Sequence, residues 1–335
     1  MTVKSNNPMK LVLSRLSQAG FKPSFVRNVV LPDWWDDEIA KTQAGYMEGL
    51  GILARHLGLE WKPLYKKGLI EFKSHGLVHF KKSPNVSEGE LALAEKIATQ
   101  ALWLTGFKTR KPYTAIPDSA AKIRQEIISK TNQPVNLKNL LEYCWDRGVV
   151  VLHICNFPPG AKKMEGLATL LDGRPGIVLC KNHQSAAWMV FLLAHELGHI
   201  AKGHVKTGDV LVDQTISRTS TDKQEQEANR FAIELLTGNP DMQFSAPHYP
   251  KAEQLAKAAV SVGHRVTVDP GVVALNFAWQ ERVFALANAA LKIIEASTSA
   301  IKLIHDRMQK GLEWKEIPET NREYIIRVTK AAVAA

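Results

Sequence analysis

The feature that most constrains this chain is an apolar segment, AAWMVFLLAHELGHIA at residues 186–201, that also carries ionisable side chains at helical spacing. On a helix of about 3.6 residues per turn, His195 and His199 lie one turn apart on the same face, so both imidazoles can reach one ion. Glu196 points about 100° away from His195 around that helix. Burying this carboxylate without a partner or a metal is costly. The segment therefore predicts a buried helix with a metal site.

The pattern His-Glu-x-x-His is typical of zinc sites in which the two histidines bind the ion and the glutamate is the general base. A catalytic zinc site uses three protein ligands and keeps one position open, so a third ligand is needed. In one known arrangement it comes ten residues after the first histidine. Here that position is Val205, and the nearest histidine, His204, comes one residue early. We expect His204 to be a rim residue rather than a group that stabilises the transition state.

The segment DKQEQEANRFAIELL, within an expected helix at 222–237, offers a carboxylate instead. Glu225 and Asn229 share one face of that helix, which favours Glu225 as the third ligand and Asn229 as a hydrogen-bond partner of a ligating imidazole. Glu227 points about 200° away from Glu225, so the two do not easily serve one ion. His264 is a weaker candidate for stabilising the oxyanion. Zn²⁺ is the expected ion, with Mn²⁺ as a substitute in vitro.

Short β-branched runs come before this pair of helices. GVVVLHI, MEGLATLL and GIVLCKN predict three strands of one small sheet, with DGRPG as a turn. We expect a loop at 205–221 and helices at 251–262, 271–296 and 298–311. The order of elements indicates an α+β fold, mostly helical, with a zincin-like core, a small sheet and a helical N-terminal module.

The N-terminal region shows mainly helical periodicity. Residues 9–60 predict short helices, including one capped by Asp33 and opened by Trp34 and Trp35, and one that closes at Gly58. LIEF and LVHF, within 66–83, suggest a hairpin around residues 74–76. Further helices are expected from an N-cap at Ser87 through residue 104, at 118–131 and at 136–146.

Composition and charge narrow the class of protein. Apolar residues make up 45% and charged residues 23% of 335, which excludes a disordered or collagen-like chain. Three cysteines without a Cys-x-x-Cys pair, and no apolar leader or membrane span, favour a cytoplasmic protein with reduced thiols. Residues 1–150 carry 22 Lys and Arg against 14 Asp and Glu. This basic half is expected to be a solvated face, with nucleic acid or an acidic partner as the alternative.

Together, FLLAHELGHI and EQEANRFAIELL resemble the ImmA/IrrE family of zinc metallopeptidases, which are gluzincin-like. The resemblance covers roughly residues 140–280 and includes VTVDPGVVALNFA, which matches a typical helix start in the family. It implies that His195, His199 and Glu225 bind zinc and that Glu196 is the catalytic base. Many members have a histidine four residues after the second ligand, where this chain has Gly203 followed by His204.

The resemblance implies site-specific cleavage of a partner protein, typically a helix-turn-helix repressor of the XRE type, in a stress or mobile-element response. GYMEGLGILARHLGL is similar to the last helix of an XRE domain, although the usual recognition signature is absent. We therefore divide the chain into a helical, degenerate XRE-like module at 1–115, a metallopeptidase domain at 116–280 and a C-terminal helical extension at 281–335. We expect the first module to contact protein rather than read DNA.

Two other functions remain open from the sequence. In one, the chain is a DNA-binding regulator whose zinc module is structural or sensory. In the other, it is an antitoxin-like or defence scaffold that forms a stable complex without cleavage. The substrate, its scissile bond, the activating signal and the oligomeric state do not follow from the sequence.

Overall fold

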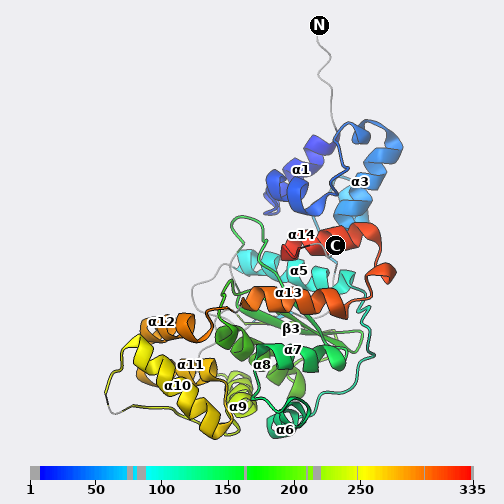
Figure 1. Ribbon diagram of the computed structural model, residues 1–335. Helices are drawn as coiled ribbons and strands as arrows, with labels where there is room; N and C mark the ends of the chain where they lie inside the picture. The colour runs from blue at the N-terminus through cyan, green and yellow to red at the C-terminus, as the bar shows by residue number, and fades with distance from the viewer. Residues whose placement is uncertain are drawn as a thin grey trace.

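The computed structural model describes residues 8–73, 78–80, 88–161, 164–208, 210–213, 220–246, 248–297 and 299–332 (Figure 1). The fold is α+β and mostly helical, as the sequence predicts, with one small mixed sheet inside layers of helices.

The N-terminal region is a set of short helices, as predicted. The first ends before Gly20, whose φ of +95° favours glycine, and another begins at Thr42, whose side chain accepts a hydrogen bond from the Gly45 amide. The predicted helix opened by Trp34 and Trp35 is wrong, because these residues lie in turns before a short 3₁₀ helix. The elements are α1 (Pro8–Gln18), α2 (Pro23–Phe25), η1 (Val26–Val30), η2 (Ile39–Lys41), α3 (Gln43–His56) and α4 (Trp61–Tyr65).

The predicted hairpin at 66–83 is also wrong. Phe72 instead forms an isolated antiparallel bridge with Leu59. Strand β1 (Val78–Phe80) pairs in parallel with β5 (Val210–Asp213), far along the chain. The turn proposed at 74–76 and the N-cap proposed at 87 lie outside the described residues. The helix expected to follow is present as α5 (Glu88–Leu104).

The sheet has the strand order β1-β5-β3-β4-β2. Its three predicted strands are confirmed as β2 (Val150–His153), β3 (Gly166–Leu171) and β4 (Arg174–Leu179). A tight turn at Asp172 and Gly173, both with positive φ, joins β3 to β4 in an antiparallel hairpin. β2 is parallel to β4, and β3 is antiparallel to β5. The expected loop at 205–221 therefore contains a strand that the sequence analysis missed.

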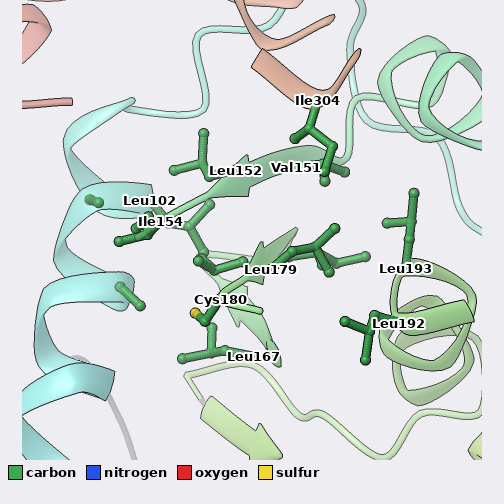
Figure 2. Close-up of a cluster of buried hydrophobic side chains, with 14 of the residues drawn as sticks. Leu102, Val151, Leu152, Ile154, Leu167, Leu179, Cys180, Leu192, Leu193 and Ile304 are labelled. Atoms are coloured by element: carbon green, nitrogen blue, oxygen red, sulfur yellow. The ribbon is translucent and has the colours of Figure 1, made fainter. Parts of the chain in front are cut away.

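Helices cover both faces of the sheet. Helix α8 (Ala186–Ala201) packs on β3 and β4 from one side, while α5 packs on the same strands from the other. Figure 2 shows Leu192 and Leu193 of α8 facing the strands from one side and Leu102 of α5 facing them from the opposite side. Helices α7 (Leu137–Asp146) and α13 (Ala300–Gly311) pack along β2. Helix α8, which carries the His-Glu-x-x-His motif, is thus held against a buried, apolar face of the sheet.

The remaining helices surround α8. Helices α6 (Ala120–Thr131) and α9 (Lys223–Thr237) confirm predicted elements. The single helix expected at 271–296 is two, because the chain turns at Arg282, which has a φ of +57°. These are α11 (Pro270–Glu281) and α12 (Phe284–Ile294); the others are α10 (Ala252–Val266), η3 (Trp314–Glu316) and α14 (Glu319–Thr329).

One continuous hydrophobic core runs from Met9 to Ala331. The C-terminal helix α14 packs on α3, α5 and η1, and its Tyr324 ring stacks on His56 with 4.8 Å between ring centroids. The first and last parts of the chain therefore share a core with the middle part. Within the described ranges, no helix is both long and apolar enough to cross a membrane.

Candidate metal centre

Helix α8 begins at a doubly capped N-terminus. The Ser185 hydroxyl accepts a hydrogen bond from the Trp188 amide, and the Glu295 carboxylate accepts hydrogen bonds from the amides of Ala186 (3.1 Å) and Ala187 (2.8 Å). These acceptors satisfy amides that the helix itself leaves unbonded. The apolar run then carries the helix through the core, so that His195, Glu196 and His199 are fully buried.

Close packing of two helices brings the downstream carboxylate to the histidines. Gly198 of α8 faces α9, and a Cβ atom at this glycine would lie 3.1 Å from Phe231 Cδ1 and 3.3 Å from Ala228 Cα. Asp222 caps the N-terminus of helix α9, and its side chain accepts hydrogen bonds from the Gln224 and Glu225 amides. The small residues at the crossing therefore allow Glu225, in the first turn of α9, to reach the motif.

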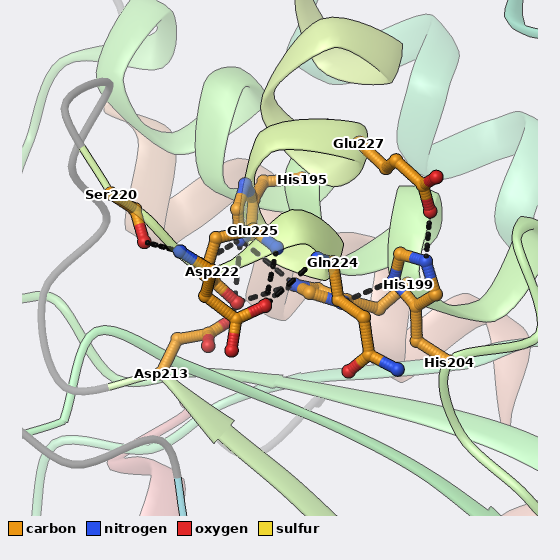
Figure 3. A network of polar contacts seen from close by, with 9 residues as sticks. All are labelled: His195, His199, His204, Asp213, Ser220, Asp222, Gln224, Glu225 and Glu227. Carbon is orange, nitrogen blue, oxygen red and sulfur yellow. Dashed lines mark hydrogen bonds and ion pairs between the residues drawn. The ribbon is translucent and has the colours of Figure 1, made fainter.

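Four buried side chains point their donor atoms toward one another: His195, His199, Asp213 and Glu225 (Figure 3). The two imidazole Nε2 atoms are 3.0 Å apart. The Nε2 of His195 lies 3.2 Å from Asp213 Oδ2 and 3.4 Å from Glu225 Oε2. The Nε2 of His199 lies 3.4 Å from Asp213 Oδ2 and 3.4 Å from Glu225 Oε1.

These separations of 3.0–3.4 Å are close to those between neighbouring ligands of a four-coordinate zinc ion. Bonds of about 2.0–2.1 Å to nitrogen and oxygen place neighbouring donors of a tetrahedron about 3.3–3.4 Å apart. The donor types, two imidazoles and two carboxylates, are also those that zinc takes in proteins. Three of the four donors are those predicted from the sequence, and the fourth, Asp213, is the last residue of β5 and was not predicted.

The electrostatics of the cluster fit a cation as well. Burial alone would lower the pKa of His195, but hydrogen bonds and charges from Asp213 and Glu225 outweigh it and raise that pKa to about 9. Burial alone would raise the pKa of Asp213 and of Glu225, yet the neighbouring imidazoles hold both below their usual range. Both carboxylates therefore stay ionised and available as donors.

Glu196, the expected base, lies against strand β3. A Cβ atom at Gly166 would be only 1.9 Å from Glu196 Oε1, so only glycine leaves room for this carboxylate. Neither carboxylate oxygen accepts a hydrogen bond from a donor among the described residues. Burial, followed by the negative charges of Asp213 and Glu225, raises the pKa of Glu196 well above its usual range. A buried carboxyl group with a raised pKa is suited to hold and release a proton.

His204 is closer to the site than a rim residue. Its Nδ1 lies 2.9 Å from Nδ1 of His199, and its Nε2 lies 2.8 Å from the Glu227 carboxylate. These two contacts hold the His199 ring through its Nδ1 atom, on the side away from the donor cluster. Carboxylates and other groups commonly orient metal-binding histidines in this way. Glu227 is itself largely exposed. It contacts His204 and is not one of the four donors.

Of the other two expected site residues, Asn229 lies on the helix that carries Glu225, and His264 lies outside the donor cluster. Asn229 is buried on α9, one turn after Glu225, which is where the sequence analysis placed it. Its proposed hydrogen bond to a ligating imidazole stays a prediction. His264 is exposed near the end of α10 and does not belong to the four-residue cluster.

Residues 146–274 match the Peptidase M78 family model, described as the IrrE N-terminal-like domain. This part of the chain is a domain of the ImmA/IrrE metallopeptidase family. The IrrE-like domain runs from the end of α7 into α11 and contains all four donors and Glu196. No curated protein and no solved structure matches the chain. The resemblance expected over residues 140–280 is confirmed, and the domain boundaries at 115 and 280 remain predictions.

Proposed function

We propose that this protein is a zinc-dependent endopeptidase that cleaves a specific partner protein in the cytoplasm. The observation that carries the proposal is the placement of a buried carboxyl, Glu196, beside a cluster of donor atoms with tetrahedral spacing. Membership of residues 146–274 in a metallopeptidase family supports the same reaction class.

Each side chain has a role in peptide hydrolysis. A bound Zn²⁺ supplies Lewis acidity and lowers the pKa of water. His195, His199 and Glu225 would hold the ion, and the contacts from His199 to His204 and from His204 to Glu227 fix the orientation of the His199 imidazole. Glu196 accepts the proton of the attacking water at its carboxylate and delivers it to the leaving amine.

The proposed substrate is a helix-turn-helix repressor of the XRE type, on the basis of the family resemblance. The helical N-terminal module is proposed to contact this partner, and its basic charge leaves nucleic acid as a further ligand of the same region. Cleavage in a stress or mobile-element response follows from the same resemblance.

The proposed reaction is tested with wild-type protein and Glu196→Gln, each loaded with Zn²⁺ or Mn²⁺. A proteome-derived peptide library and purified XRE-type repressors serve as substrates, and mass spectrometry reads the products. We expect cleavage by the wild type and a loss of about 10²–10⁴-fold in the variant, with unchanged zinc content. Full cleavage by Glu196→Gln would show that the base is another residue, and no cleavage of any substrate by loaded wild type would remove the peptidase proposal.

A second function is favoured by one observation. A site with four protein donors is typical of structural zinc, as expected for a DNA-binding regulator or a scaffold with a structural or sensory metal module. That reading predicts salt-dependent DNA binding, or a stable complex with a partner, that is unaffected by Glu196→Gln.

A further inference from the structure

Asp213 is as well placed to bind the ion as the expected third ligand. Its Oδ2 lies 3.2 and 3.4 Å from the two imidazole nitrogens, and the Glu225 oxygens lie 3.4 Å from the same atoms. Three ligands are enough for a catalytic zinc site, which leaves the fourth position to water or substrate. In this protein the Asp213 carboxylate would take that fourth position on a bound ion.

Burial indicates the same closed state. The side chains of His195 and His199 are 0% exposed, that of Asp213 is 2% exposed and that of Glu225 is 8% exposed. Four donors at this depth would surround a bound ion with protein and leave little room for water. Such an enclosure is a property of structural zinc sites.

A purely structural site does not account for Glu196. Its carboxyl group is fully buried, and no donor in the described part of the chain hydrogen-bonds to either carboxylate oxygen, so its ionised form is costly there. Gly166 provides the space for it, and Gly166 is the register partner of Asp213 across the β3–β5 pairing. Glu196, the candidate base, therefore lies next to Asp213, the fourth donor, and a catalytic zinc site needs only three.

We propose that Asp213 is a resident fourth ligand that keeps the resting site closed, and that its carboxylate leaves the ion before cleavage begins. The proposal rests on the proposed peptidase function. With Asp213 and Glu225 both bound, two negative charges balance a divalent ion and weaken its pull on a further oxygen. With Asp213 displaced, one positive charge remains, and a position opens beside Glu196.

The test counts open positions on the metal without measuring cleavage. The full-length protein is loaded with Co²⁺, and acetohydroxamate, a small chelator that binds only an accessible ion, is titrated while the visible absorption is recorded. We expect Asp213→Ala to retain one Co²⁺ and to respond to acetohydroxamate at a concentration at least about tenfold lower than the wild type requires. Asp213→Asn, which is nearly isosteric, is expected to respond between the two and replaces the alanine variant if that variant does not fold.

Asp241→Ala is the matched control, because Asp241 is exposed and pairs with Arg230 on the surface. It should behave as the wild type does. Equal acetohydroxamate affinity in wild type and Asp213→Ala would overturn the proposal, as would loss of Co²⁺ from both Asp213 variants, since the other three ligands would then not hold the ion. The peptidase proposal fails separately: a wild type that cleaves but has an open cobalt site refutes only the fourth ligand, and a closed site that opens in Asp213→Ala without cleavage of any substrate refutes only the peptidase.

Discussion

Gly166→Ala should inactivate the peptidase without touching a metal ligand. The new Cβ would lie 1.9 Å from Glu196 Oε1 and 2.7 Å from its Cδ, whereas real Cβ atoms stay at least 3.0 Å from other heavy atoms. Glu196 must therefore retreat by about 1.1 Å, the difference between 3.0 and 1.9 Å. A misplacement of about 1 Å in a reacting group can lower the rate about 10²-fold. We expect a loss of that order with zinc content unchanged.

The assay compares initial cleavage rates on the best peptide from the library for wild type, Gly166→Ala and Gly51→Ala. Gly51 is the matched control, because no atom lies within 4 Å of a Cβ built there. Urea unfolding adds an independent readout. The added methyl should destabilise the protein by about 1–3 kcal/mol as overpacking, and this cost should largely disappear in a Glu196→Ala background.

Two results would refute this reasoning. One is a Gly166→Ala variant that cleaves at the wild-type rate, because the base would then not need the position seen against β3. The other is an equal loss of stability in the wild-type and Glu196→Ala backgrounds, because the methyl group would then clash with something other than this carboxyl.

Two further predictions test the helix crossing and a buried histidine. Gly198→Val should push α9 away from α8 and weaken Zn²⁺ binding by about 10–100-fold in a competition titration with a chelating dye. Gly51→Val, which makes the same change in helix propensity at a glycine with no neighbouring atom within 4 Å of a Cβ, should bind normally, and equal affinities of the two variants would contradict the role of the crossing. Burial, assisted by the charges of Arg327 and Arg55, lowers the pKa of His56 to about 4, so the unfolded chain binds its proton first as the pH falls. The free energy of unfolding should therefore decrease by about 3 kcal/mol between about pH 6.5 and 4 because of this residue. Urea unfolding of His56→Phe should show a smaller decrease over this pH range than the wild type does. Parallel pH profiles of the two proteins would rule out a contribution from His56.

The sequence predicted elements well wherever the pattern was long and local. The motif helix, the helix that carries Glu225 and the three strands from β2 to β4 all have clear periodicity or turn signals. Besides the helix expected at 271–296, which is divided at Arg282, the errors fall on short segments. Trp34 and Trp35 follow a plausible cap but continue into turns, and LVHF pairs with a distant strand instead of its neighbour.

Asp213 was missed for a different reason. Strand β5 has only four residues, VLVD, inside a polar segment that was taken for a loop. The β-branched run was a usable signal for a strand. The placement of its last residue beside two histidines was not, because it depends on the register Gly166↔Asp213, a non-local pairing that no spacing along the chain encodes.

The family match ends within α11, but the hydrophobic core does not. Helix α5 covers the sheet face opposite α8, and α13 covers β2, so segments outside the IrrE-like domain complete the burial of its strands. Helix α14 then packs back onto α3 and η1. The terminal regions therefore serve first as a cover for the sheet that holds the site. A partner bound by the N-terminal module must use what this cover leaves open, including the exposed side chains of Trp34 (47%) and Leu69 (86%), rather than the helix faces already buried in the core.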